Sequence, residues 1–148
     1  MTGPAPSGAT LVTATSGDRR PALSPITMRR IAIVMAGVAA TLGVLSALHL
    51  SGGIHGRSAA FNAADAGVAE AAIGAILAGG ALAVARFGEH ARSVALAAIG
   101  FAAVGFVVGL TFTAGGGDLL DIIYHVAVLP LLFGAAVVLI RRRNSTAT

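Results

Sequence analysis

Four long apolar runs, separated by short polar segments, follow one another after about residue 27. They predict helices over about 30–50, 63–85, 93–114 and 119–140. The stretch from Ile31 to Leu50 carries no charged residue, and a helix needs about 20 apolar residues to cross the hydrocarbon core of a bilayer. The runs do not alternate between apolar and polar residues, as the strands of a membrane β-barrel would. With short loops between them, they predict an all-α membrane protein with an antiparallel four-transmembrane-helix bundle.

The two ends of the chain differ from the apolar runs. Residues 1–27 are rich in Pro, Ser, Thr, Gly and Ala and lack the apolar periodicity that could bury a core. We expect this segment to be a disordered cytoplasmic tail, residues 28–143 to form the transmembrane domain, and residues 144–148 to be a short cytoplasmic tail.

Composition supports a single membrane domain. Only 11% of the 148 residues are charged, against about 25% in soluble proteins, and 56% are hydrophobic. This charge content is too low to cover a soluble surface. The chain has no cysteine, which excludes disulfides, thiolate metal sites and cysteine nucleophiles.

Charge distribution predicts the orientation of the helices. The net charge is +4, and all ten basic residues are arginine. Nine of them flank the predicted helices: Arg19, Arg20, Arg29, Arg30, Arg86, Arg92, Arg141, Arg142 and Arg143. They cluster at alternate helix ends, so the positive-inside rule predicts that both termini are cytoplasmic. The Ala- and Arg-rich, lysine-free composition resembles that of a high-GC bacterium, so we expect a multi-pass chain in a bacterial inner (plasma) membrane. No basic stripe with interleaved aromatics is present, so we expect the lipid bilayer, and no nucleic acid, as a partner.

Ionisable residues inside predicted membrane helices are candidate functional groups, because burying them in lipid is costly. Five polar side chains fall in the outer half of the predicted bundle: Glu70, His125, Asp121, His49 and Tyr124. With a rise of about 1.5 Å per residue, Glu70 and His125 each lie roughly 10 Å from the start of their helices. We therefore expect an outward-facing pocket with Glu70 and His125 coupled at its floor, Asp121 on its wall and His49 at its rim.

Three chemistries fit such a pocket. Glu70, His125 and His49 could bind a divalent metal through imidazole nitrogen and carboxylate oxygen. A buried Glu/His pair could carry protons, and His49 with His125 could be axial ligands of haem. The residues come from three helices without an HExxH-type motif, so the pattern leaves the cofactor open.

A purely structural interpretation is also available. Asp65, Asp118 and Asp121 sit near predicted helix N-termini, where the helix dipole favours acidic residues. His125 could bond a backbone carbonyl or Glu70. Glu70 fits this interpretation least well, because it lies two turns inside a helix and its carboxylate needs a partner.

Small residues recur at four-residue spacing and predict close helix packing within one chain, with self-association as the alternative. The spacings are those of Gly67, Ala71, Ala75 and Gly79, of Gly105 and Gly109, and of Gly43 and Ala47.

Three runs carry a resemblance: NAADAGVAEAAIGAILAGGA (62–81), GFAAVGFVVGLTFTAGG (100–116) and DIIYHVAVLPLL (121–132). They resemble small four-helix bacterial integral membrane proteins of unknown function, over about residues 29–143. The chain is also similar to DoxX-like proteins, in size and layout only. The resemblance implies the fold and no site.

These patterns favour a non-enzymatic accessory or assembly component of the inner membrane, acting with another membrane protein or with itself. No nucleophile and base can be paired, so no catalytic residue is expected. Two alternatives stay open. One is a metal-, haem- or proton-binding redox accessory protein, and the other is a subunit of an oligomeric small-solute transporter.

Overall fold

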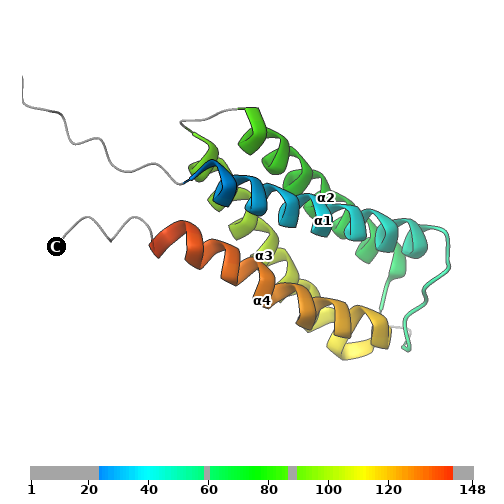
Figure 1. Ribbon diagram of the computed structural model, residues 1–148. Helices are drawn as coiled ribbons and strands as arrows, with labels where there is room; N and C mark the ends of the chain where they lie inside the picture. The colour runs from blue at the N-terminus through cyan, green and yellow to red at the C-terminus, as the bar shows by residue number, and fades with distance from the viewer. Residues whose placement is uncertain (1–23, 59–60, 87–89, 142–148) are drawn as a thin grey trace, which may run out of the picture.

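A computed structural model describes residues 24–58, 61–86 and 90–141 and contains four α-helices (Figure 1). They are α1 (Pro25–Leu50), α2 (Ala63–Arg86), α3 (Ala91–Gly116) and α4 (Leu119–Arg141). The described residues include no strand, so the expected all-α four-helix bundle is confirmed. Each helix is long and apolar enough to cross a membrane, which makes the chain a multi-pass membrane protein. The predicted tail over residues 144–148 and residues 1–23 of the predicted N-terminal tail lie outside the described residues.

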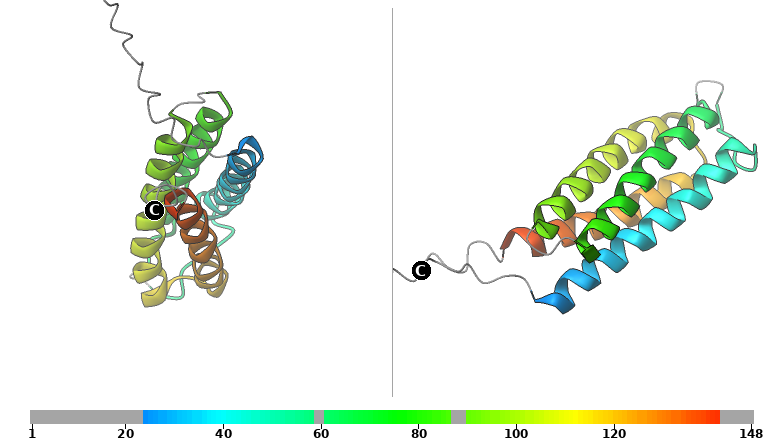
Figure 2. Two further views of the ribbon diagram at one scale, coloured as in Figure 1. Left: turned by 60° about the vertical axis from the view of Figure 1, so that its left-hand side comes forward. Right: turned by 90° about the horizontal axis from the view of Figure 1, so that it is seen from above.

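The helices pack in the order of the chain. The α1–α2 contact is the most extensive, followed by α2–α3 and α3–α4, whereas α1 and α4 meet at only a few points. α1 starts and α4 ends at the same end of the bundle, as Figures 1 and 2 show. The two loops that join α1 to α2 and α3 to α4 lie together at the opposite end (Figure 1).

The core consists of one apolar row from each helix. In α1 the buried row recurs every three or four residues, the spacing of one helix face. Its largest fully buried members are Met35 and Leu42 from α1, Leu77 from α2, Phe106 from α3 and Leu132 from α4. Many other large apolar side chains are exposed on the outer surface, which suits a surface that faces lipid.

Polar residues cap three of the helices. The Ser24 hydroxyl accepts a hydrogen bond from the backbone N–H of Thr27 (3.3 Å), and Pro25 follows in the first turn, so α1 begins earlier than its apolar run. Asn62 caps α2 by accepting the N–H of Ala64 (3.0 Å). The Asp118 carboxylate accepts the N–H of Leu120 (2.8 Å) and caps α4.

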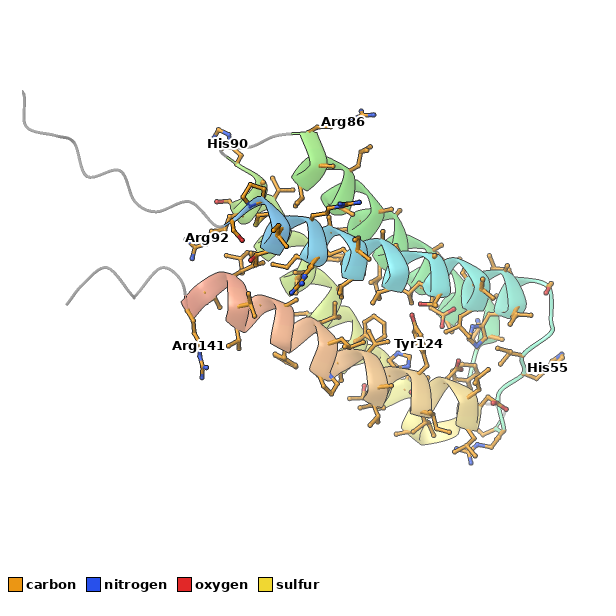
Figure 3. The ribbon with its side chains drawn as sticks, viewed as in Figure 1. His55, Arg86, His90, Arg92, Tyr124 and Arg141 are labelled. Carbon is orange, nitrogen blue, oxygen red and sulfur yellow. The ribbon has the colours of Figure 1, made fainter. Side chains whose placement is uncertain are left out.

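The charged ends of the bundle differ from each other. Arg86, Arg92 and Arg141 lie at the end where α1 begins, and His55 lies at the opposite end (Figure 3). Arg57 is the one arginine described in the loops at that opposite end. Its backbone N–H donates to the carbonyl of Gly116 (2.6 Å), and its Nε donates to that of Gly117 (2.7 Å). Arg57 therefore ties the α1–α2 loop to the end of α3.

Small residues pack inside the bundle at only some of the predicted positions. A Cβ on Gly105 would lie 2.6 Å from Ile73 of α2, and one on Gly109 would lie 2.6 Å from the His125 ring of α4. Gly43 and Gly79 face open space, with nothing within 4 Å of an added Cβ. Residues spaced by four drift around a helix of about 3.6 residues per turn. After Gly67, the buried row of α2 therefore departs from the predicted row of small residues and continues through Glu70 and Gly74.

Candidate functional site

Three ionisable side chains from three helices meet inside the bundle, near the end opposite the arginines. We call them the His49 cluster: His49 from the last turn of α1, Glu70 from α2 and Asp121 from the first turn of α4. The side chains of His49 and Asp121 are fully buried, and 7% of the Glu70 side chain is exposed. The cluster therefore lies inside the protein, whereas the sequence predicted an outward-facing pocket.

The imidazole ring of His49 lies between the two carboxylates. Its Nδ1 is 2.9 Å from Oε2 of Glu70, and its Nε2 is 3.0 Å from Oδ2 of Asp121. Both distances lie in the usual range of N–H···O hydrogen bonds. One side chain thus joins α2 to α4 through α1, even though α1 and α4 make few other contacts.

Close packing of α1 on α2 brings His49 within reach of Glu70. Gly67 lies one turn before Glu70, and a Cβ at this position would be 2.9 Å from Leu50 and 3.1 Å from the Cβ of His49. The hydroxyl of Ser46 donates a buried hydrogen bond to the carbonyl of Gly67 (2.7 Å). The missing side chain and this hydrogen bond together hold the two helices at the distance that the His49–Glu70 contact requires.

Asp121 is the least satisfied member of the cluster. Asp118 already caps α4, so the carboxylate of Asp121 is free to point into the bundle. Its Oδ2 contacts His49, but its Oδ1 is buried and has no hydrogen-bond partner among the described residues. Buried carboxylate oxygens normally accept at least one hydrogen bond, so this unpaired atom needs an explanation.

The charge of the cluster follows from its contacts. Both ring nitrogens of His49 face carboxylate oxygens, and both can donate only when the ring is a cation. An imidazolium with two ionised carboxylates carries a net charge of −1. Within the described part of the chain, the only ion pairs are these two contacts of His49, so no arginine there offsets the remaining charge.

The structure places His125 and Tyr124 beside the cluster and not in it. Nδ1 of His125 donates to the backbone carbonyl of Asp121 (2.8 Å), and its ring packs on Phe106 with centroids 5.0 Å apart. The hydroxyl of Tyr124 lies 2.6 Å from that of Thr41, one of the contacts between α4 and α1. This hydrogen bond from His125 to a backbone carbonyl is one of the two contacts that the structural interpretation allowed for the residue.

Glu70 therefore pairs with His49, whereas His125, which was expected to couple with Glu70, bonds the carbonyl of Asp121. Glu70 and His125 lie at similar distances from the starts of their helices, but the ends of the helices are not level. Gly67, in the second turn of α2, lies against His49 and Leu50 at the very end of α1. The first turn of α2 thus extends past α1 and brings Glu70 level with His49.

The geometry of the cluster favours a metal ion over haem as its ligand. Axial haem ligation by His49 and His125 does not fit, because Nδ1 of His125 bonds the carbonyl of Asp121 and its Nε2 lies against Gly109. A metal ion fits better: one ligand atom each from His49, Glu70 and Asp121 can be chosen so that all three lie within 4.8 Å of one another.

The sequence did not single out three residues in this part of the bundle. They are Ser46, which bonds Gly67, Thr41, which contacts Tyr124, and Phe61, whose ring centroid lies 6.0 Å from that of His49. Hydroxyl residues are common in membrane helices and often bond their own helix, so Ser46 and Thr41 gave no distinguishing signal. Phe61 lies just before α2 and contacts His49 only because the chain folds back at the loop.

No protein-family model matches this chain, and comparisons with curated proteins and with solved structures gave no match.

Proposed function

We propose that this chain is a non-enzymatic accessory protein of a bacterial inner membrane and that it binds a cation at the His49 cluster. The proposal rests on one observation, namely two buried carboxylates that share a single imidazole. With both carboxylates ionised, such a cluster is negatively charged in a region where an uncompensated charge costs several kcal/mol or more. A bound cation would remove that cost, so the electrostatics of the site favour cation binding.

The arginines support the membrane orientation in this proposal. Arg29, Arg30, Arg86, Arg92 and Arg141 all belong to the end of the bundle where α1 begins and α4 ends. With that end in the cytoplasm, the positive-inside rule is satisfied, and the His49 cluster lies in the outer half of the membrane. The cation would then be taken from the outer side.

Cation-dependent thermal stability tests this function. Protein purified in mild detergent and stripped with EDTA is unfolded by heat with Na⁺, K⁺, Mg²⁺, Ca²⁺, Mn²⁺ or Zn²⁺ added in turn. A ligand that binds only the folded state at 100 times its Kd stabilises it by about 2.7 kcal/mol. We expect at least one cation to raise the Tm by several degrees, since about 1 kcal/mol moves the Tm by a few degrees in a protein of this size.

The matched variants are Asp121→Asn in the cluster and Asp65→Asn outside it. Asp65 is exposed at the start of α2, so its substitution removes one acid and leaves the cluster intact. We expect Asp65→Asn to keep the cation-dependent shift and Asp121→Asn to lose it. A wild-type protein that responds to none of the cations, or an equal response of Asp121→Asn, would contradict the proposal.

A further inference from the structure

We infer that the cation is a divalent first-row transition metal, held by one ring nitrogen of His49 and one oxygen each of Glu70 and Asp121. The inference rests on the proposed cation-binding function and specifies the ligand class and the coordinating atoms. Four observations carry it: the convergence of the three ligand atoms, the unpaired oxygen of Asp121, the charge balance and the donor set.

The three ligand atoms already converge. They lie within 4.8 Å of one another. Bonds of about 2.0–2.2 Å from nitrogen or oxygen to a metal place two ligands of one ion at most about 4.4 Å apart. Three ligands of one ion cannot all be that far apart, so metal binding would require the three side chains to rotate toward the ion.

The Oδ1 of Asp121 is a buried acceptor without a hydrogen-bond partner among the described residues. The Asp121 side chain is fully buried, and its Oδ2 is already engaged by His49. A buried carboxylate oxygen without a hydrogen bond is costly, and metal coordination would satisfy it. This carboxylate therefore retains an oxygen that a metal could use.

Charge balance selects a divalent ion. A metal-binding histidine is neutral, so His49, Glu70 and Asp121 together carry −2 when they act as ligands. A divalent cation brings this total to zero, whereas a monovalent cation leaves −1 inside the bundle. Because uncompensated charge is most costly in a buried site, the neutral combination is favoured.

The donor set selects transition metals over Mg²⁺ and Ca²⁺. Ca²⁺ takes about 6–8 oxygen ligands, and Mg²⁺ retains several waters, and neither prefers imidazole. One imidazole with two carboxylates suits Mn²⁺, Fe²⁺, Co²⁺ or Zn²⁺. The Ser46–Gly67 hydrogen bond lies beside the site and holds the helices that supply two of the three ligands.

Cobalt is the probe, because its absorption in the visible range reports its ligands directly. Full-length protein in detergent is stripped with EDTA and titrated with Co²⁺, followed by absorption and by calorimetry. We expect one Co²⁺ per chain with a d–d band, displacement of that band by Zn²⁺, and no displacement by Mg²⁺ or Ca²⁺ at the same concentration.

The variants test the named atoms. His49→Gln and Asp121→Asn should each weaken Co²⁺ binding by about 100-fold or more, since even residues that only orient ligands account for about 10–100-fold. His55→Gln and Asp65→Asn remove an exposed histidine and an exposed acid and should bind like the wild type. Asp121→Asn keeps an amide oxygen for His49 and makes the cluster neutral, so in EDTA it should unfold no earlier than the wild type. Its loss of binding is then not a loss of folding.

Two outcomes separate this inference from the function on which it rests. If Na⁺, Mg²⁺ or Ca²⁺ stabilises the protein through Asp121 while Co²⁺ gives no band, cation binding stands and the transition-metal assignment is overturned. If no cation binds, both fail. A Co²⁺ band that survives His49→Gln also overturns the assignment, because the imidazole would then not be a ligand.

Discussion

At the scale of single residues, polar contacts hold α4 against α1. Where these helices approach each other, His49 contacts Asp121 and Thr41 contacts Tyr124. Lipid provides no hydrophobic driving force between helices, so hydrogen bonds and close packing must hold them together. In the Thr41–Tyr124 pair, the two hydroxyl oxygens lie 2.6 Å apart.

A double-mutant cycle of Thr41→Val and Tyr124→Phe tests this contact. Interhelical hydrogen bonds in membrane proteins contribute about 0.6 kcal/mol on average, so we expect a coupling energy of about 0.5–1 kcal/mol in the free energy of unfolding. Unfolding in mixed detergent micelles measures it. Thr111→Val is the control, because the Thr111 hydroxyl bonds Val108 of its own helix (2.6 Å). If the coupling energy of Thr41→Val with Tyr124→Phe is no larger than that of Thr111→Val with Tyr124→Phe, the hydroxyl pair does not stabilise the fold.

At the scale of helices, the packing of α1 on α2 positions the site. This pair has the most extensive contact in the bundle, and Gly67 allows the two helices to approach closely beside His49 and Glu70. On the same helix, Gly79 faces open space. The two glycines therefore provide a matched comparison between packed and unpacked positions.

Gly67→Ala should destabilise the protein by about 1–3 kcal/mol, the usual cost of overpacking, because its Cβ would meet Leu50, His49 and the carbonyl of Ser46. Gly79→Ala should be neutral or stabilising by up to about 1 kcal/mol, since alanine is the better helix former. Unfolding free energies measure both. We also expect Gly67→Ala to weaken cation binding by separating Glu70 from His49. Equal effects of the two substitutions would show that the close approach at Gly67 does not matter.

At the scale of the whole molecule, charge asymmetry predicts which end of the bundle faces the cytoplasm. Arg86, Arg92 and Arg141 lie at one end and His55 at the other (Figure 3). Because the chain has no cysteine, a single introduced cysteine reports the side of the membrane without interference.

Labelling of His55→Cys and His90→Cys in intact bacterial cells tests the orientation. Both positions are exposed, at opposite ends of the bundle. We expect a membrane-impermeant maleimide to label His55→Cys and to spare His90→Cys, because the positive-inside rule predicts a cytoplasmic location for the arginine-rich end. Permeabilised cells are the control, in which both cysteines should react. The reverse pattern in intact cells would place the His49 cluster on the cytoplasmic side.

Hydropathy along the chain was enough to predict four helices and an all-α bundle. In lipid a backbone must satisfy its own hydrogen bonds, so long apolar runs become helices whatever their neighbours are. The chain also showed that Glu70 must find a partner, because a carboxylate two turns inside a membrane helix cannot remain alone.

Only the tertiary structure decided which partner Glu70 has. That choice depends on the stagger of α2 against α1 and on the rotation of each helix about its axis. Alanine- and glycine-rich faces specify rotation weakly, and the close approach at Gly67 determines the stagger instead. The result is that His49, expected at the rim, lies between Glu70 and Asp121, while His125 turns to the carbonyl of its own helix. Local sequence determines each helix, but a contact between three helices depends on packing distances that no single segment encodes.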